Sequence, residues 1–198
     1  LTAHTEFGRR RATSVSAHED SIVASLSREN YLQITRTKEL QHHINEYWEM
    51  IMHDAYQDSR SDMTELCDER LYTKLHLAIA KSLHEDWTLE DASEEVKKDW
   101  INDVTRHNLG SDVLNHRQFS DALFELVDEW CDMISMEMYT GFLTKIWKNI
   151  RCFWDTTEAG VDRYTLTDLD RINSIHREME QLKKEGHKLK KIEYSKLS

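Results

Sequence analysis

The chain has 198 residues, six Trp and a hydrophobic fraction of 39%, which is enough for one or two domains with a real core. It has no Pro and only five Gly, and because these residues punctuate turns, their scarcity disfavours sandwiches and dinucleotide-binding folds. The formal net charge of −11 disfavours nucleic acid as a partner, since phosphate binding requires a clustered basic surface. No apolar run approaches the roughly 20 residues that cross a bilayer, so we expect no membrane segment either.

The first part of the chain is polar and contains three consecutive arginines from Arg9, followed by a Ser/Thr-rich stretch. Such a composition buries too little apolar surface to fold alone, so we expect residues 1–36 to form an extended arm that orders against a partner. The segment Arg10-Arg11-Ala12-Thr13 resembles a basophilic kinase site, and the sequence leaves open whether Thr13 or Ser14 is phosphorylated.

From about residue 37 onward, apolar residues recur at three- and four-residue spacing, which is typical of amphipathic helices. The six runs span residues 40–55, 71–83, 92–104, 119–130, 139–153 and 169–182. Each run is one apolar stripe, which must be buried against the others. The pattern therefore predicts an all-α fold, a bundle of about six helices.

Capping signals precede four of these runs. Thr88-Leu-Glu-Asp91 and Asn115-His-Arg-Gln118 resemble capping boxes before the third and fourth helices. Ser135 is suited to cap the fifth helix, and Thr165 or Thr167 the sixth.

These signals divide the chain into the arm, a helical domain at 37–165, and a C-terminal helix with a basic tail at 166–198. The end of the chain is basic, because residues 183–198 hold six Lys and two Glu. An acidic partner surface, such as a tubulin tail, is one candidate contact for Lys183–Lys196, and a solvated helix end is the other interpretation.

The stretch around residue 113 has the spacing of an EF-hand calcium loop. In such a 12-residue loop the eighth position is aliphatic and the thirteenth is usually Phe. In His107–Gln118, Leu114 holds the eighth position and Phe119 follows as the thirteenth. Val113–Phe119 therefore looks like the second half of an EF-hand loop that enters its exit helix.

The wider stretch Tyr72–Ile150 resembles a family of degenerate EF-hand-like (calmodulin-like helix-pair) proteins associated with eukaryotic cilia and flagella. The resembling pieces are Tyr72–Leu83, Lys98–Trp100, Gln118–Trp130 and Tyr139–Leu143. Within them, Phe124-Glu-Leu-Val-Asp-Glu-Trp130 is the most distinctive. The resemblance implies EF-hand-like helix pairs and a place in the axoneme.

Calcium requires roughly six to eight oxygen ligands, with a carboxylate first and a bidentate Glu last. In this loop the first, third, fifth, sixth and twelfth positions are His107, Leu109, Ser111, Asp112 and Gln118. Leu109 offers no side-chain oxygen and Gln118 offers no charged pair, so we predict that the loop binds no calcium. If Leu66 is placed at the eighth position of the preceding loop, Arg70 becomes the twelfth and opposes a cation.

The last loop, 155–166, keeps one alternative open. It begins with Asp155, has Glu158 fourth and Gly160 sixth, but ends on Leu166 at the twelfth position. We expect no metal site, and we keep Asp155 and Glu158 as the candidate ligands of a calcium-responsive sensor.

No catalytic or cofactor motif stands out in the sequence. His42 and His43 are adjacent, so on a helix they point about 100° apart and are poorly placed to share a metal. Gly141-Phe-Leu-Thr-Lys145 lacks the second Gly of a phosphate loop. A His–Cys or His–Ser pair that meets only in the folded chain stays open. Three cysteines without a CxxC pair indicate a reducing compartment: Cys67, Cys131 and Cys152. We therefore expect neither an enzyme nor a cofactor.

Aromatic residues are the candidates for partner binding. Those at 139–154 have two interpretations: core contacts with the preceding helix, or a groove that receives an amphipathic helix of a partner. Six Trp exceed the needs of one small core, and Trp is enriched at binding hot spots. The partner-binding candidates are Trp87, Trp130, Trp147, Trp154, Phe119 and Phe142.

The sequence-based hypothesis is a non-catalytic structural or adaptor subunit of a large assembly, which docks proteins through calcium-independent helix pairs. The resemblance implies a cytoskeletal location in the ciliary or flagellar axoneme. It also implies that the partners are other axonemal subunits, tubulin or an amphipathic partner helix. The alternatives are the calcium-responsive sensor and a helical subunit of an organellar complex.

Overall fold

The computed structural model describes residues 37–59, 65–107, 112–131 and 135–185, which are mostly helical with two small antiparallel sheets. The prediction of a mostly helical fold is confirmed, whereas the two sheets are additional. The arm at 1–36 with its kinase-like site, and the end of the basic tail beyond residue 185, lie outside the described residues. Among the described helices, each is either too short or too polar to serve as a membrane span.

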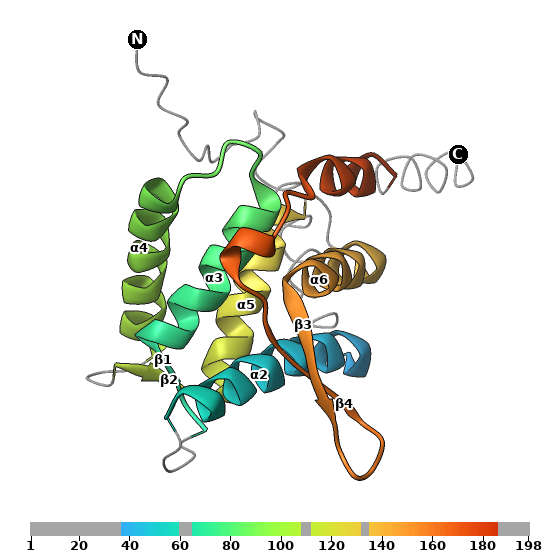
Figure 1. Cartoon of the computed structure of the whole chain (residues 1–198). Helices are drawn as coiled ribbons and strands as arrows, with labels where there is room; N and C mark the ends of the chain where they lie inside the picture. The colour runs from blue at the N-terminus through green and yellow to red at the C-terminus, as the bar shows by residue number, and fades with distance from the viewer. Residues whose placement is uncertain (1–36, 60–64, 108–111, 132–134, 186–198) are drawn as a thin grey trace, which may run out of the picture.

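The elements follow the predicted order closely (Figure 1). They are α2 (Lys38–Ser59), β1 (Cys67–Asp68), α3 (Glu69–Leu83), α4 (Leu89–His107), β2 (Val113–Leu114), α5 (His116–Trp130), α6 (Met136–Ile150), β3 (Arg151–Thr156), β4 (Asp162–Leu166) and the 3-10 turn η1 (Leu169–Arg171). Residues 176–185 form a further helix.

The predicted helix starts are stabilised by the side chains that the sequence named. Asn115 Oδ1 accepts the backbone N–H of Gln118 at 3.0 Å, and Gln118 Oε1 accepts that of Asn115 at 2.8 Å, which completes a capping box. Ser135 Oγ accepts the N–H of Met138 at 3.1 Å. Thr88 Oγ1 accepts the N–H of Asp91 at 3.2 Å. The predicted capping box at Asn115 and the predicted cap at Ser135 are confirmed. At Thr88 only the cap is confirmed, because the Asp91 carboxylate accepts from the Thr88 hydroxyl instead of closing a capping box.

Two helix–strand–helix units are joined through their strands. In α2–β1–α3 and α4–β2–α5 the strand lies directly before the second helix, and β1 pairs antiparallel with β2. The pairing places Cys67 opposite Leu114, and both side chains are fully buried. Helix α3 packs against α4, and α2 packs against α5, so the two units share one core.

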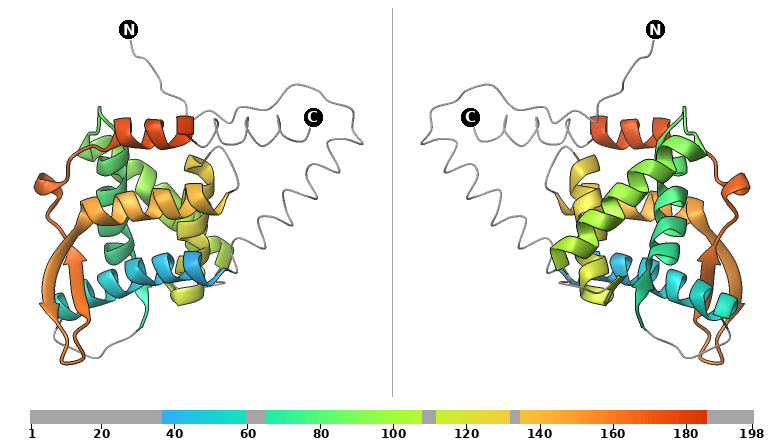
Figure 2. Two further views of the ribbon diagram at one scale, coloured as in Figure 1. Left: turned by 90° about the vertical axis from the view of Figure 1, so that its right-hand side faces the viewer. Right: turned by 90° about the vertical axis from the view of Figure 1, so that its left-hand side faces the viewer.

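Helix α6 completes this core from the other side. It contacts α2, α3 and α5, and it lies alongside α2 in the views of Figures 1 and 2. Tyr47 of α2 is fully buried and donates its hydroxyl to the carbonyl of Leu143 at 2.7 Å. Its ring lies 6.2 Å from that of Trp147. Each fully buried side chain of this size stabilises the fold by roughly 1.5–3 kcal/mol.

The fifth predicted helix is shorter than the apolar pattern indicated. Helix α6 ends at Ile150, and Phe153, which the pattern placed on it, lies on β3 with 57% of its surface exposed. Strand β3 pairs with β4, and the hairpin turns at Gly160, whose φ of +77° favours glycine. Thr165 pairs with Cys152 in this hairpin, so it caps no helix.

The sixth predicted helix begins later than expected. Leu169 and Ile172 belong to the η1 turn and its end, and the helix starts only at residue 176. The backbone N–H of Ile175 donates to the carbonyl of Ser82 at 2.7 Å, which ties this segment to the end of α3. Leu166, Ile172 and Met179 belong to the same core cluster as α2–α6, so the boundary at 165/166 does not separate two cores.

Candidate functional site

In the EF-hand-like loop at 107–118, for which the sequence predicts no calcium binding, the side-chain oxygen of the last position serves a helix cap. Gln118 Oε1 accepts the backbone N–H of Asn115, so it serves the cap of α5. Leu114 and Phe119, the predicted eighth and thirteenth positions, are both fully buried. Leu109 and Ser111 lie outside the described residues. The described half of the loop is therefore organised around apolar burial and helix capping.

The preceding loop differs by one residue from its predicted alignment. The residue opposite Leu114 is Cys67, whereas Leu66, which the sequence placed at the eighth position, is 37% exposed. Burial raises the pKa of the Cys67 thiol to about 12, so it stays a protonated core group. Within the described residues, no group of three or more His, Cys, Asp or Glu side chains gathers around a potential metal position.

The last candidate loop, 155–166, is a hairpin and not a helix-flanked loop. Asp155 lies on β3, where an ion pair of 3.9 Å joins its Oδ2 to Nη1 of Arg163. Glu158 is exposed in the turn. Because the backbone of 151–156 and 162–166 is extended and paired, it does not wrap around an ion in the predicted way. The hairpin therefore differs from the apolar pattern, which predicted a helix up to Phe153 and another from Leu169. The sensor alternative stays a prediction.

Three of the six predicted partner-binding aromatics are core residues. Phe119, Phe142 and Trp147 are exposed by 0%, 1% and 4%. Phe119 contacts Trp48 with ring centroids 5.3 Å apart, and the Trp147 ring packs against Tyr164 and under Arg151. A partner cannot reach these side chains in this conformation, because the chain's own helices cover them. Their assignment as docking residues is corrected to core.

The other three aromatics remain accessible. Trp154 on β3 is 48% exposed, and its ring lies 5.8 Å from that of His53 on α2. Phe153 and Val161 in the same hairpin are exposed by 57% and 60%. Trp87 is half-buried in the connection between α3 and α4, with the ammonium of Lys81 5.2 Å from its ring centroid. Trp130 is half-buried and lines a surface hollow.

This hollow is a groove of about 1100 Å³ between α3, α4 and α5. Its apolar lining comes from all three helices: Ile79 and Leu83 of α3, Ala92 and Val96 of α4, and Ala122, Leu126 and Trp130 of α5. At its rim the Trp130 ring contacts His84 at 5.2 Å. The ammonium of Lys183 lies 5.3 Å from the same ring. We call this surface the α3/α4/α5 groove.

The rim of the groove is acidic. Glu95, Asp99 and Asp103 recur every four residues along α4, and Glu125 and Glu129 face them from α5. Partial burial and the neighbouring charges of Asp103, Glu129 and Glu95 raise the pKa of Asp99 to about 6. Asp103 accepts a hydrogen bond from the Tyr72 hydroxyl at 2.6 Å, and Glu125 pairs with Arg106. The mutual repulsion around Asp99 marks this rim as a place where a cation is favourable.

A buried histidine completes the wall of the groove. His76 is 5% exposed, stacks on Tyr72 with ring centroids 3.8 Å apart, and lines the groove. Burial lowers its pKa to about 3, so the ring is neutral. Among the described residues its Nε2 has no hydrogen-bond partner. The groove wall therefore holds an uncommitted polar atom.

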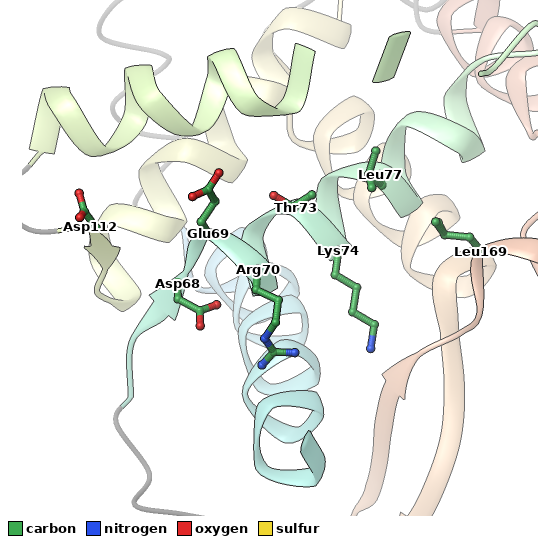
Figure 3. A pocket seen from close by; sticks show the side chains of 8 residues that line it. All are labelled: Asp68, Glu69, Arg70, Thr73, Lys74, Leu77, Asp112 and Leu169. Atoms are coloured by element: carbon green, nitrogen blue, oxygen red, sulfur yellow. The ribbon is translucent and has the colours of Figure 1, made fainter. Parts of the chain in front are cut away.

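The second hollow lies along the first turns of α3 and is lined by eight residues (Figure 3). In this view Arg70 and Lys74 extend to one side of α3 and Glu69 to the other. Asp68 caps α3 by accepting the N–H of Leu71, and Lys74 pairs with Asp54 of α2. Because these groups serve the fold, this hollow is the weaker candidate for a binding site.

Sequence reasoning missed the groove acids, although a signal for them was present. Acids at positions 95, 99 and 103 lie on one face of a helix, and like charges at this spacing destabilise an isolated helix. Two facing helices with such acids, at 95–103 and 125–129, would have indicated a shared acidic surface. The burial and missing partner of His76 had no sequence signal.

Comparison of the chain with protein-family models, with curated proteins and with solved structures found no match.

Proposed function

We propose that the chain is a calcium-independent, EF-hand-like adaptor, a non-catalytic structural subunit of a large assembly. The two helix–strand–helix units and the antiparallel pairing of their strands support the EF-hand-like part of this proposal. The contacts of α2 with α5 and of α3 with α4 support the same pairing. The proposal takes the units as a docking scaffold that holds its shape without an ion.

The capping box of α5 is the observation that carries the calcium-independent part. The register of β1 and β2 makes Cys67 and Leu114 equivalent positions, so the twelfth positions become Leu71 and Gln118. Leu71 is 2% exposed and carries no oxygen in its side chain, and this residue replaces Arg70 in the alignment. Gln118 is hydrogen-bonded to the backbone of Asn115. Neither loop offers the bidentate carboxylate that calcium requires last.

The position of helix α6 favours a rigid docking scaffold over a sensor that opens when it binds an ion. It covers the faces of α2, α3 and α5 with its own buried residues, among them Phe142, Leu143 and Ile146. A sensor that opens to expose an apolar groove would have to expel this helix, at the cost of several buried side chains. Docking is therefore assigned to the outer surfaces, where Trp130 and Trp154 are accessible.

The location in a ciliary or flagellar axoneme rests on the family resemblance of Tyr72–Ile150 and is proposed on that basis. Its partners are other axonemal subunits, with tubulin as a candidate for the basic tail. The organellar-complex alternative has no specific observation in its favour.

The test is affinity purification of the full chain from extracts of flagellated cells, with calcium added and with calcium chelated. We expect the same identified axonemal subunits in near-equal amounts under both conditions. We also expect Trp154→Ala to lower their recovery, while Ile101→Ala, an apolar residue that is 53% exposed on α4, leaves it unchanged. Recovery of no axonemal subunit, or recovery only with calcium, would overturn the proposal.

A further inference from the structure

We infer that the α3/α4/α5 groove binds a lysine- or arginine-rich amphipathic helix of a partner protein. This inference rests on the proposed function, since it names the chemistry of one docking partner. It concerns a surface other than the inner face of the helix pairs, which α6 already occupies.

The groove has an apolar floor and an acidic rim, which match the apolar face and the basic face of an amphipathic helix. The part of the groove floor that solvent reaches is apolar, with the partly buried Ala80 of α3 and Leu126 of α5. Ile79, Leu83 and Val96 lie beneath it as core residues that are only 1–4% exposed. Two roughly facing helices, α4 and α5, form its walls, which is the usual setting of helix-in-groove recognition. Its volume of about 1100 Å³ exceeds that of a typical small-molecule pocket.

Six acids line the groove against the two cations Lys98 and Arg106, so the charges on the rim select a basic partner over an acidic one. Glu95, Asp99 and Glu129 lie close enough for Glu95 and Glu129 to perturb the Asp99 carboxyl. No ion pair or hydrogen bond joins any of the three to another described residue, whereas Asp103, Glu125 and Asp128 have partners within the protein. Lysine or arginine side chains above this rim would relieve the repulsion among the three carboxylates.

Two further observations point to a ligand at this place. His76 lines the groove and is only 5% exposed. Its Nε2 atom has no hydrogen-bond partner among the described residues. The ring of Trp130 lies 5.3 Å from the ammonium of Lys183, so a lysine already packs on this aromatic side chain beside the groove. An aromatic anchor beside an apolar floor is typical of binding hot spots.

The probe is a synthetic peptide of about 18 residues, with leucine and lysine repeated at helical spacing. Its matched partner carries glutamate in place of lysine. Calorimetry with the full chain is expected to show saturable binding of the lysine peptide and none of the glutamate peptide. Binding of both peptides, or of neither, would overturn the inference.

Neutral variants locate the site. Replacing the three rim acids together, Glu95→Gln, Asp99→Asn and Glu129→Gln, is expected to weaken binding of the lysine peptide by about tenfold. The control removes the same charge from exposed acids outside the groove, Glu49→Gln, Asp121→Asn and Glu137→Gln, and is expected to bind as the unmodified chain does. All six positions are exposed, so both variants are expected to fold, which circular dichroism checks. If both triple variants lost the same affinity for the lysine peptide, the net charge of the chain would explain the binding, and the inference would be contradicted.

The basic tail of the chain is the competing occupant. If the lysine peptide bound only after Lys188→Glu, Lys190→Glu and Lys191→Glu, the groove would belong to the chain's own tail and the partner assignment would be wrong. If the peptide failed to bind while axonemal subunits were still recovered, the proposed function would survive without this groove. If the peptide failed to bind and no axonemal subunit was recovered, the proposed function would be overturned as well.

Discussion

His76 links the acidic groove to the core of the protein. Its ring stacks on Tyr72, whose hydroxyl donates a hydrogen bond to Asp103. Tyr72 therefore connects the buried imidazole to the acidic rim. Burial lowers the pKa of His76 from 6.5 to about 3. Since the unfolded chain takes up this proton near pH 6.5 and the folded chain does not, the folded state loses stability as the pH falls from 6.5 toward 3.

Replacement of this histidine removes that pH dependence. Each pH unit below 6.5 costs about 1.4 kcal/mol at this site, so the share at pH 5 is roughly 2 kcal/mol. His76→Phe keeps an aromatic ring on Tyr72, and urea unfolding at pH 7 and pH 5 should show a smaller loss of stability on acidification than in the unmodified chain. His42→Phe, at an exposed position, serves as the control. Equal losses in His76→Phe and the unmodified chain would show that the imidazole protonates freely in the fold.

Asp99 has the opposite dependence. Partial burial and the charges of Asp103, Glu129 and Glu95 raise its pKa to about 6, above the ordinary 3.8. Its contribution to stability is therefore complete below pH 3.8 and is lost as the pH rises through 6. Because much of the side chain is still open to solvent, screening limits the effect, and Asp99→Asn should stabilise the chain by only about 0.5 kcal/mol at pH 7 and by nothing at pH 3.5. Thermal unfolding at the two pH values measures this, and a destabilised variant at pH 7 would contradict the repulsion at the rim.

At the scale of elements, the capping box gives α5 a start that needs no bound ion. Asn115 and Gln118 satisfy two backbone N–H groups that the helix itself leaves without partners. In this protein the Gln118 side chain thus stabilises a helix terminus, which holds the start of α5 in place next to the strand pair.

Removal of this cap should therefore be measurable without any ligand. Asn115→Ala is expected to lower the free energy of unfolding by about 1 kcal/mol, while Asn115→Ser, which keeps a capping oxygen, should cost much less. Denaturant unfolding with calcium chelated compares the two. If Asn115→Ala were neutral, the cap would not be the element that holds α5.

Helix α6 is the element that distinguishes core from docking surface. Phe142 is 1% exposed on α6, so Phe142→Ala should leave a cavity and cost about 3–5 kcal/mol of stability in the isolated chain. Trp154→Ala, at a position 48% exposed, should change stability by less than about 0.5 kcal/mol. Thermal unfolding decides between them, and a neutral Phe142→Ala would return this residue to the list of partner contacts.

At the scale of the whole molecule, local signals predicted the helices well and the tertiary arrangement only in part. The periodicity of apolar residues and the capping side chains Thr88, Asn115 and Ser135 are local, so the starts of α4, α5 and α6 could be derived from sequence. The hairpin could not, because Phe153 continues the apolar spacing of α6 and only its pairing with Tyr164 makes the segment a strand.

The candidate site was predictable to a smaller extent. Trp130 was identified because its residue type is enriched in interfaces, but the sequence could not separate it from Phe119, which the fold buries completely. Whether an aromatic side chain faces a core or a groove depends on which helices pack around it. The convergence of α3, α4 and α5 on His76 and Asp99 is a property of the tertiary structure alone.

The central claim is that the paired helix–strand–helix units hold their shape without an ion. Calorimetric titration of the full chain with calcium at millimolar concentration tests it most directly. The account predicts no saturable heat of binding and an unchanged thermal unfolding curve. A saturable heat that raised the unfolding temperature, and that disappeared on replacement of Asp112, Gln118 or Asp155, would contradict it.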